Sequence, residues 1–125
     1  MINTLLVMGG GAVGSALRYN LGRLATYLFG PGYPWGTLLA NLIGGFAMGV
    51  LAGCLARSGG SGENFRLLLG VGVIGGFTTF SAFSLETFSM IQRGETMTAL
   101  FYVLASVVGA VGALAIGIFA VRSLA

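Results

Sequence analysis

The sequence predicts an all-α membrane protein with four transmembrane helices. Of its 125 residues, 56% are hydrophobic and only 7% are charged, whereas soluble domains carry about 25% charged residues. Long apolar runs alternate with short polar turns, and a helix needs roughly 20 apolar residues to cross a bilayer. One of these runs contains a polar, glycine-rich segment, Gly75 to Glu86. Because a backbone interrupted at membrane depth must face protein, water or an ion, we expect this segment to hold the functional site.

The first predicted span runs from residue 1 to a point between Arg18 and Tyr27, and Arg18 is its first charge. A secretory signal would need a positive region before its apolar stretch, so we interpret this run as a transmembrane helix. The turn at residues 29–34 follows and contains both prolines of the chain. The second span is predicted from Trp35 to about Ala56, and residues 57–64 form a flexible loop.

The third predicted span, residues 65–91, would be roughly 40 Å long as one straight helix, against a hydrocarbon core of about 30 Å. This excess favours a helix that is broken near Gly75–Thr79, with the pair Gly75-Gly76 as the expected place. The fourth span is predicted from Met97 to about Val121. Residues 1–125 would then form a single four-helix transmembrane domain.

The arginines divide evenly between the two predicted sides of the membrane. The side of the N-terminus has Arg57, Arg66 and Arg122, and the opposite side has Arg18, Arg23 and Arg93. Because this balance gives a weak orientation signal, we expect the chain to insert both ways and to pair as an antiparallel dual-topology homodimer.

Small residues recur at every fourth position in each span, which lets helix backbones approach closely in lipid. They are Gly10 and Gly14; Gly45, Gly49 and Gly53; Gly72 and Gly76; and Gly109, Ala113 and Gly117.

Composition excludes several kinds of site. The chain has no His and its three acidic residues are all Glu, so a His metal site and a Ser-His-Asp triad are excluded, and we expect no enzyme. The arginines form no basic stripe, which argues against a nucleic-acid partner. Gly9 to Gly14 matches G-x-G-x-x-G but has no preceding strand and no acidic residue about 20 positions on, so we interpret it as helix packing. Cys54 is interpreted as a small packing residue.

The candidate site combines aromatic rings with hydroxyl and amide donors. In a helix that restarts after the break, Phe80 and Phe83 would share one stripe, and Ser81 and Ser84 the neighbouring one. A phenyl ring has a positive edge that can accept a small anion, and serine hydroxyls can replace lost water. This combination favours a dehydrating path for an anion.

Other polar residues in the spans have two interpretations each. Asn41, and Tyr102 with Ser106, could donate to an anion or hydrogen-bond between helices. Arg18 could attract anions to a vestibule or anchor the helix at the headgroups. Glu86 could be a proton or ion group or complete a hydrogen-bond network. Backbone carbonyls freed by the break would be good ligands for a hard monovalent cation.

These residues resemble the Fluc (CrcB-type) fluoride channels over nearly the whole chain. The resemblance is carried by Gly9 to Gly14 leading to Arg18-Tyr19, by Trp35-Gly36-Thr37-Leu38 to Asn41 with Gly44, and by Gly75-Gly76-Phe77-Thr78-Thr79-Phe80-Ser81-Ala82-Phe83-Ser84. The third of these segments is the most specific.

The resemblance implies a passive fluoride-selective channel that exports fluoride across a bacterial-type cytoplasmic (inner) membrane. It implies an antiparallel dimer with two pores and a structural Na⁺ held by the backbone carbonyls of Gly75 and Thr78 of both subunits. The implied pore residues are Asn41, Phe80, Phe83, Ser81, Ser84 and Tyr102, with Arg18 in the vestibule. Two positions depart from the family pattern, because Ala82 and Gly112 stand where threonines are expected.

Two other functions compete with the channel. A small multidrug exporter would have a similar size, but it would need a carboxylate in the first helix, which has none. A purely structural membrane subunit would explain the glycines but would give Asn41 and the polar segment no role.

Overall fold

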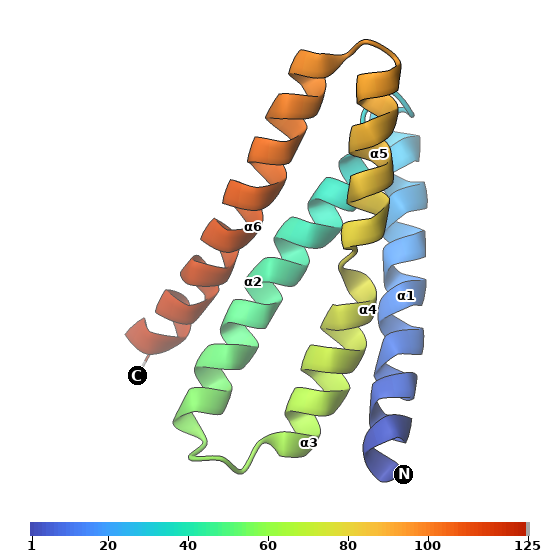
Figure 1. Cartoon of the computed structure of the whole chain (residues 1–125). Helices are drawn as coiled ribbons and strands as arrows, with labels where there is room; N and C mark the ends of the chain where they lie inside the picture. Colours follow the sequence, from blue (N-terminus) through green and yellow to red (C-terminus); the bar gives the residue numbers. More distant parts are fainter. Residues whose placement is uncertain (125) are drawn as a thin grey trace.

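The computed structural model describes residues 1–124, and among these it contains helices and no strand. These helices form four segments that are joined by short turns (Figure 1). Three are continuous: α1 (Ile2–Phe29), α2 (Trp35–Arg57) and α6 (Thr96–Ser123). The composite third segment consists of α3 (Glu63–Phe65), the π-helix η1 (Arg66–Ile74), α4 (Gly75–Phe77) and α5 (Phe80–Gln92). The predicted all-helical fold with four segments is confirmed.

Three of the segments are long and apolar enough to cross a membrane: Trp35–Arg57, Glu63–Gln92 and Thr96–Ser123. α1 is as long as α6, with 28 residues each. It includes Arg18, Arg23 and several polar residues and glycines, which lower its mean hydropathy. The first predicted span is therefore a long helix that is less apolar than the other three.

The segments pack in two pairs, with α1 along η1 and α4, and α2 along α6 (Figure 1). Glycines make both contacts close. A Cβ added to Gly14 would meet the carbonyl oxygen of Val73 in η1, and a Cβ added to Gly49 would meet that of Leu114 in α6. The predicted role of glycines at four-residue spacing is confirmed at these contacts, because any larger residue would separate the helices.

The backbone leaves the helical conformation at Thr78 (φ −84°, ψ 159°) and Thr79 (φ −153°, ψ 124°), between α4 and α5. Gly75 is helical, with φ −60° and ψ −39°, so the glycine pair is not where the backbone becomes extended. A Cβ on Gly76 would lie 2.7 Å from the carbonyl oxygen of Gly11 in α1. Gly76 therefore permits a close helix contact, and the two threonines carry the extended backbone.

Thr79 then starts α5 as its N-cap, because its side-chain oxygen accepts a hydrogen bond of 3.1 Å from the Ala82 N–H. The buried core lies where α2, α5 and α6 meet, and it consists of Leu38, Phe83, Met90, Ala99 and Tyr102. This core holds the start of α5 against α2 and α6, which positions the candidate site.

Candidate functional site

Asn41 of α2 pairs with the extended backbone at Thr79. Its Nδ2 donates to the Thr79 carbonyl oxygen at 3.0 Å, and its Oδ1 accepts from the Thr79 N–H at 2.8 Å. The amide side chain thus replaces the partners that a continuous helix would give to these two backbone groups. One of the two amide hydrogens on Nδ2 is needed for this contact, which leaves the other for a further acceptor.

A groove of about 440 Å³ opens beside this contact, between α2, the start of α5 and α6. Its polar wall is formed by Asn41, Thr78, Thr79 and Ser106, and its aromatic wall by Phe80 and Phe83; the remaining lining is aliphatic or glycine. None of the groups that line it carries a charge. Such a groove can hold a small ion only if ring edges and hydroxyls replace its water.

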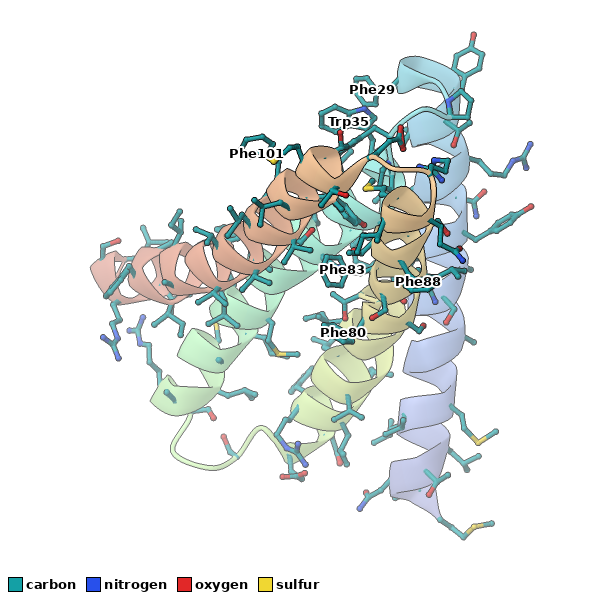
Figure 2. The ribbon with its side chains drawn as sticks, turned by 45° about the horizontal axis from the view of Figure 1, so that its top comes forward. Phe29, Trp35, Phe80, Phe83, Phe88 and Phe101 are labelled. Atoms are coloured by element: carbon teal, nitrogen blue, oxygen red, sulfur yellow. The ribbon has the colours of Figure 1, made fainter. Side chains whose placement is uncertain are left out.

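The two phenyl rings lie together on the groove side of α5. Their centroids are 5.4 Å apart with an interplanar angle of 47°. Phe83 is buried, whereas Phe80 is 76% exposed at the open side of the groove. Figure 2 shows both rings on the side of α5 that faces α2 and α6, and Phe88 on another side of that helix. The predicted shared stripe of Phe80 and Phe83 is therefore present.

Ser106 supplies a hydroxyl that lines the groove from α6. It is 5% exposed, and among the described residues its Oγ has no hydrogen-bond partner. A buried hydroxyl without a partner costs free energy, so it is available to donate to whatever enters the groove. The hydroxyl that the sequence placed one turn after Tyr102 thus lines this groove.

Tyr102 lies behind the groove and is fully buried. Its ring is 5.3 Å from that of Phe83, and its hydroxyl donates to Glu86 Oε1 at 2.9 Å. Thr37 of α2 donates to the other carboxylate oxygen, Oε2, also at 2.9 Å. Glu86 therefore joins α2, α5 and α6 through two hydroxyl donors.

Sequence reasoning gave Thr37 no role at this carboxylate. One signal was present, because Thr37 precedes Asn41 by four residues and so shares its helix face. Its partner on the third segment could not be found from that spacing.

The two predicted pore serines of α5, Ser81 and Ser84, lie outside the groove. Ser81 Oγ is 3.3 Å from Thr79 Oγ1, and Ser84 Oγ donates to the Phe80 carbonyl at 2.8 Å. Both side chains are exposed on the surface of the chain. Within one chain they neighbour the aromatic pair without facing the same space.

Arg18 reaches from α1 to the third segment, where its Nε donates to the Gly76 carbonyl at 3.2 Å. With Tyr19, Arg23 and Thr37 it lines a hollow of about 540 Å³ between α1 and α2. Arg18, which the sequence predicts in a vestibule, therefore contacts the third segment two residues before the extended backbone and borders this hollow.

Comparison with known proteins identifies the family. The family model described as "CrcB-like protein, Camphor Resistance (CrcB)" matches residues 5–118. The chain belongs to this CrcB-like family. The resemblance inferred from the sequence motifs is thereby confirmed.

Relatives of this CrcB-like chain extend over its full length. It is 54% identical to a protein of Novosphingobium aromaticivorans, with 100% of both chains covered. It is 56% identical to one of Phenylobacterium zucineum over 94% of each, and 50% identical to one of Mesorhizobium japonicum over 99% of each. Each of these relatives is named "Fluoride-specific ion channel FluC".

The extended backbone of the CrcB-like chain also frees two carbonyls. In a continuous helix the Thr79 N–H would bond to the Gly75 carbonyl, but here it donates to Asn41. The Ala82 N–H would likewise bond to the Thr78 carbonyl, but it donates to Thr79 Oγ1. These oxygens fit the requirement of a hard monovalent cation such as Na⁺, which binds carbonyls of unwound helices.

Proposed function

We propose that this chain is a multi-pass channel through which fluoride crosses a bacterial cytoplasmic (inner) membrane passively and selectively. The observation that carries the proposal is the uncharged groove lined by Phe80, Phe83, Asn41 and Ser106. The names of three relatives that are at least half identical over nearly their whole length support fluoride as the ion. The family's members act on no covalent bond, so no residue receives a catalytic role.

Selectivity would follow from what the groove offers to an anion that loses its water. The ring edges of Phe80 and Phe83 carry positive partial charge, and the free Ser106 hydroxyl and the second Nδ2 hydrogen of Asn41 supply donors. A small anion gains most from these short contacts, and a larger one fits them less well. Since no fixed positive charge lines the groove, the anion is not trapped and can leave.

The pores would be completed by a second copy. We propose an antiparallel dual-topology homodimer with two pores, in which the exposed Phe80 of each chain faces its partner. Ser81 and Ser84, which are exposed in one chain, would then lie along the path, with Tyr102 supporting it from behind. Arg18 would attract anions to the vestibule from solution.

A structural Na⁺ at the dimer axis would be held by the Gly75 and Thr78 carbonyls of both copies. When bound, such an ion would offset the repulsion among the partial negative charges of these carbonyl oxygens and would so stabilise the pairing of the two chains. This chain contributes two acceptors that keep these carbonyls out of helical hydrogen bonds. Asn41 Oδ1 takes the N–H that would otherwise bond to the Gly75 carbonyl, and Thr79 Oγ1 takes the one that would otherwise bond to the Thr78 carbonyl.

The proposed function is tested by passive fluoride efflux from proteoliposomes, read with a fluoride electrode and compared with chloride efflux. We expect rapid fluoride release with little chloride release. Absence of fluoride release from protein that is shown to be dimeric would refute the channel and favour a structural membrane subunit.

Two variants test the assigned path. Phe80→Ile should slow fluoride release at least tenfold while the dimer persists, because the residue packs loosely but faces the groove. Phe88→Ile is the matched control, since Phe88 lies on the same helix, is 57% exposed and does not line the groove. Asn41→Asp should also slow release, because it places a negative charge beside the path. Equal release by all three variants and the wild type would contradict the path.

The antiparallel pairing has its own test. A cysteine introduced near the C-terminus, in a chain whose Cys54 is replaced by Ala, should react with a membrane-impermeant thiol reagent from both sides of the membrane. Labelling from one side only would exclude dual topology.

A further inference from the structure

A continuous line of aromatic rings connects the turn between α1 and α2 to the groove. Successive centroids are 4.9 to 5.5 Å apart along the series Phe29, Trp35, Tyr33, Tyr102, Phe83 and Phe80. The first three belong to the turn and its edges, and the last three to α5 and α6. Figure 2 shows Phe29 and Trp35 together at one end of the molecule, with Phe83 and Phe80 deeper along α5.

Tyr33 is the link between the two halves of this line. Its ring meets that of Tyr102 edge-to-face, with centroids 5.5 Å apart and an interplanar angle of 83°. Phe83 also packs on Tyr102, with centroids 5.3 Å apart, and the Tyr102 hydroxyl donates to Glu86. The fully buried Tyr102 is thus fixed from three directions, and Tyr33 provides the only one of these contacts that comes from a turn.

The backbone around Tyr33 is restrained, which lets a turn residue hold a fixed position. α1 ends at Phe29 and is capped by Gly30, whose positive φ of 80° suits glycine. Pro34 restricts the preceding residue to extended conformations, and the Trp35 N–H donates to the Tyr33 carbonyl at 2.8 Å. Burial raises the pKa of the Tyr33 phenol.

A cavity lies beside the turn, and the Tyr33 ring forms part of its lining. It measures about 400 Å³ and is lined by Tyr33, Trp35, Thr37 and Glu86 among others. Without the Tyr33 ring, this space would extend to Tyr102, whose ring could then move away from Phe83. The carboxylate of Glu86 would lose its aligned donor in the same movement.

We propose that Tyr33 is a positioning residue of the pore, which acts through Tyr102 on Phe83 and Glu86. This inference rests on the proposed function, and it adds the α1–α2 turn to the parts of the chain that determine the rate and selectivity of fluoride release. A plain interfacial anchor would instead need only an amphipathic ring at the headgroups. Tyr27 has that environment, because it lies near the same end of α1 and is 86% exposed.

The test compares Tyr33→Leu, Tyr33→Phe and the matched control Tyr27→Leu in proteoliposomes. Tyr33→Leu should slow fluoride release about threefold to tenfold, which is what the geometry-dependent part of an aromatic pair supports, and should lower the fluoride-to-chloride ratio. Tyr33→Phe keeps the ring and should restore both values to those of the wild type. Tyr27→Leu should leave both unchanged.

A second measurement tests the contact without any ion flux. The unfolding midpoints of Tyr33→Leu and Tyr102→Leu in detergent should be non-additive in the double variant, whereas those of Tyr27→Leu and Tyr102→Leu should add.

The outcomes separate the two proposals. If the wild type releases fluoride and Tyr33→Leu matches it, or if Tyr33→Phe is as slow as Tyr33→Leu, the positioning role is refuted while the channel stands. Additive midpoints for positions 33 and 102 would also refute it. No fluoride release by the wild type would overturn the channel, and the role of Tyr33 with it.

Discussion

Replacing Asn41 by alanine removes the only side chain, among residues 1–124, that hydrogen-bonds α2 to the extended backbone of the third segment. Two hydrogen bonds are lost, of 3.0 Å to the Thr79 carbonyl and of 2.8 Å from the Thr79 N–H. Interhelical hydrogen bonds of this kind contribute about 0.6 to 1.7 kcal/mol each in membranes. We therefore expect Asn41→Ala to lower the free energy of unfolding by about 1 to 3 kcal/mol.

The same change should alter the backbone. Once Asn41 Oδ1 is gone, the acceptor that a continuous α-helix would offer to the Thr79 N–H is the Gly75 carbonyl. Rewinding of this turn would withdraw that carbonyl from the proposed Na⁺ site. Fluoride release should therefore fall together with stability, and added Na⁺ should stabilise the variant less than the wild type.

The assay is denaturant unfolding in detergent, followed by the fluorescence of Trp35, which is the only tryptophan of the chain. Asn20→Ala is the control, because Asn20 Nδ2 makes one exposed bond of 2.8 Å to Ala16 within α1. We expect the control to change stability by less than about 0.5 kcal/mol. Equal stability of Asn41→Ala and Asn20→Ala would refute the inference that Asn41 maintains the extended backbone.

Three further predictions follow from other contacts. Gly49→Ala should destabilise the protein by about 1 to 3 kcal/mol, because the added Cβ would meet the α6 backbone at the α2–α6 contact. Gly9→Ala should not destabilise it, because the space around Gly9 is open. Unfolding in detergent compares the two variants. Arg18→Gln should slow fluoride release and weaken its dependence on ionic strength, and an unchanged salt dependence would argue against the vestibule role. Thr37→Val should cost about 1 kcal/mol through the lost bond to Glu86, and stability equal to that of the wild type would show that the bond is dispensable.

The sequence by itself determined that the chain forms four helical segments and that these segments suit a lipid bilayer. Apolar runs long enough to cross a bilayer, separated by a proline-rich and a glycine-rich turn, are local properties of the chain. The start of α2 at Trp35 agrees with the predicted start of the second span, because Pro34 ends the preceding turn. Glycine spacing also predicted which helix faces approach closely, since backbone contact requires the absence of side chains at regular intervals.

Only the tertiary structure decided where the backbone becomes extended and which polar groups meet. The glycine pair Gly75-Gly76 was the local signal for a break in the helix. However, Asn41 on α2 accepts the hydrogen bond of the Thr79 N–H, and the extended residues are therefore Thr78 and Thr79. The positions of Thr37 and Tyr102 at Glu86 have the same origin. Hydrogen bonds between residues many positions apart depend on how helices pack, and spacing along one helix carries no information about a partner on another.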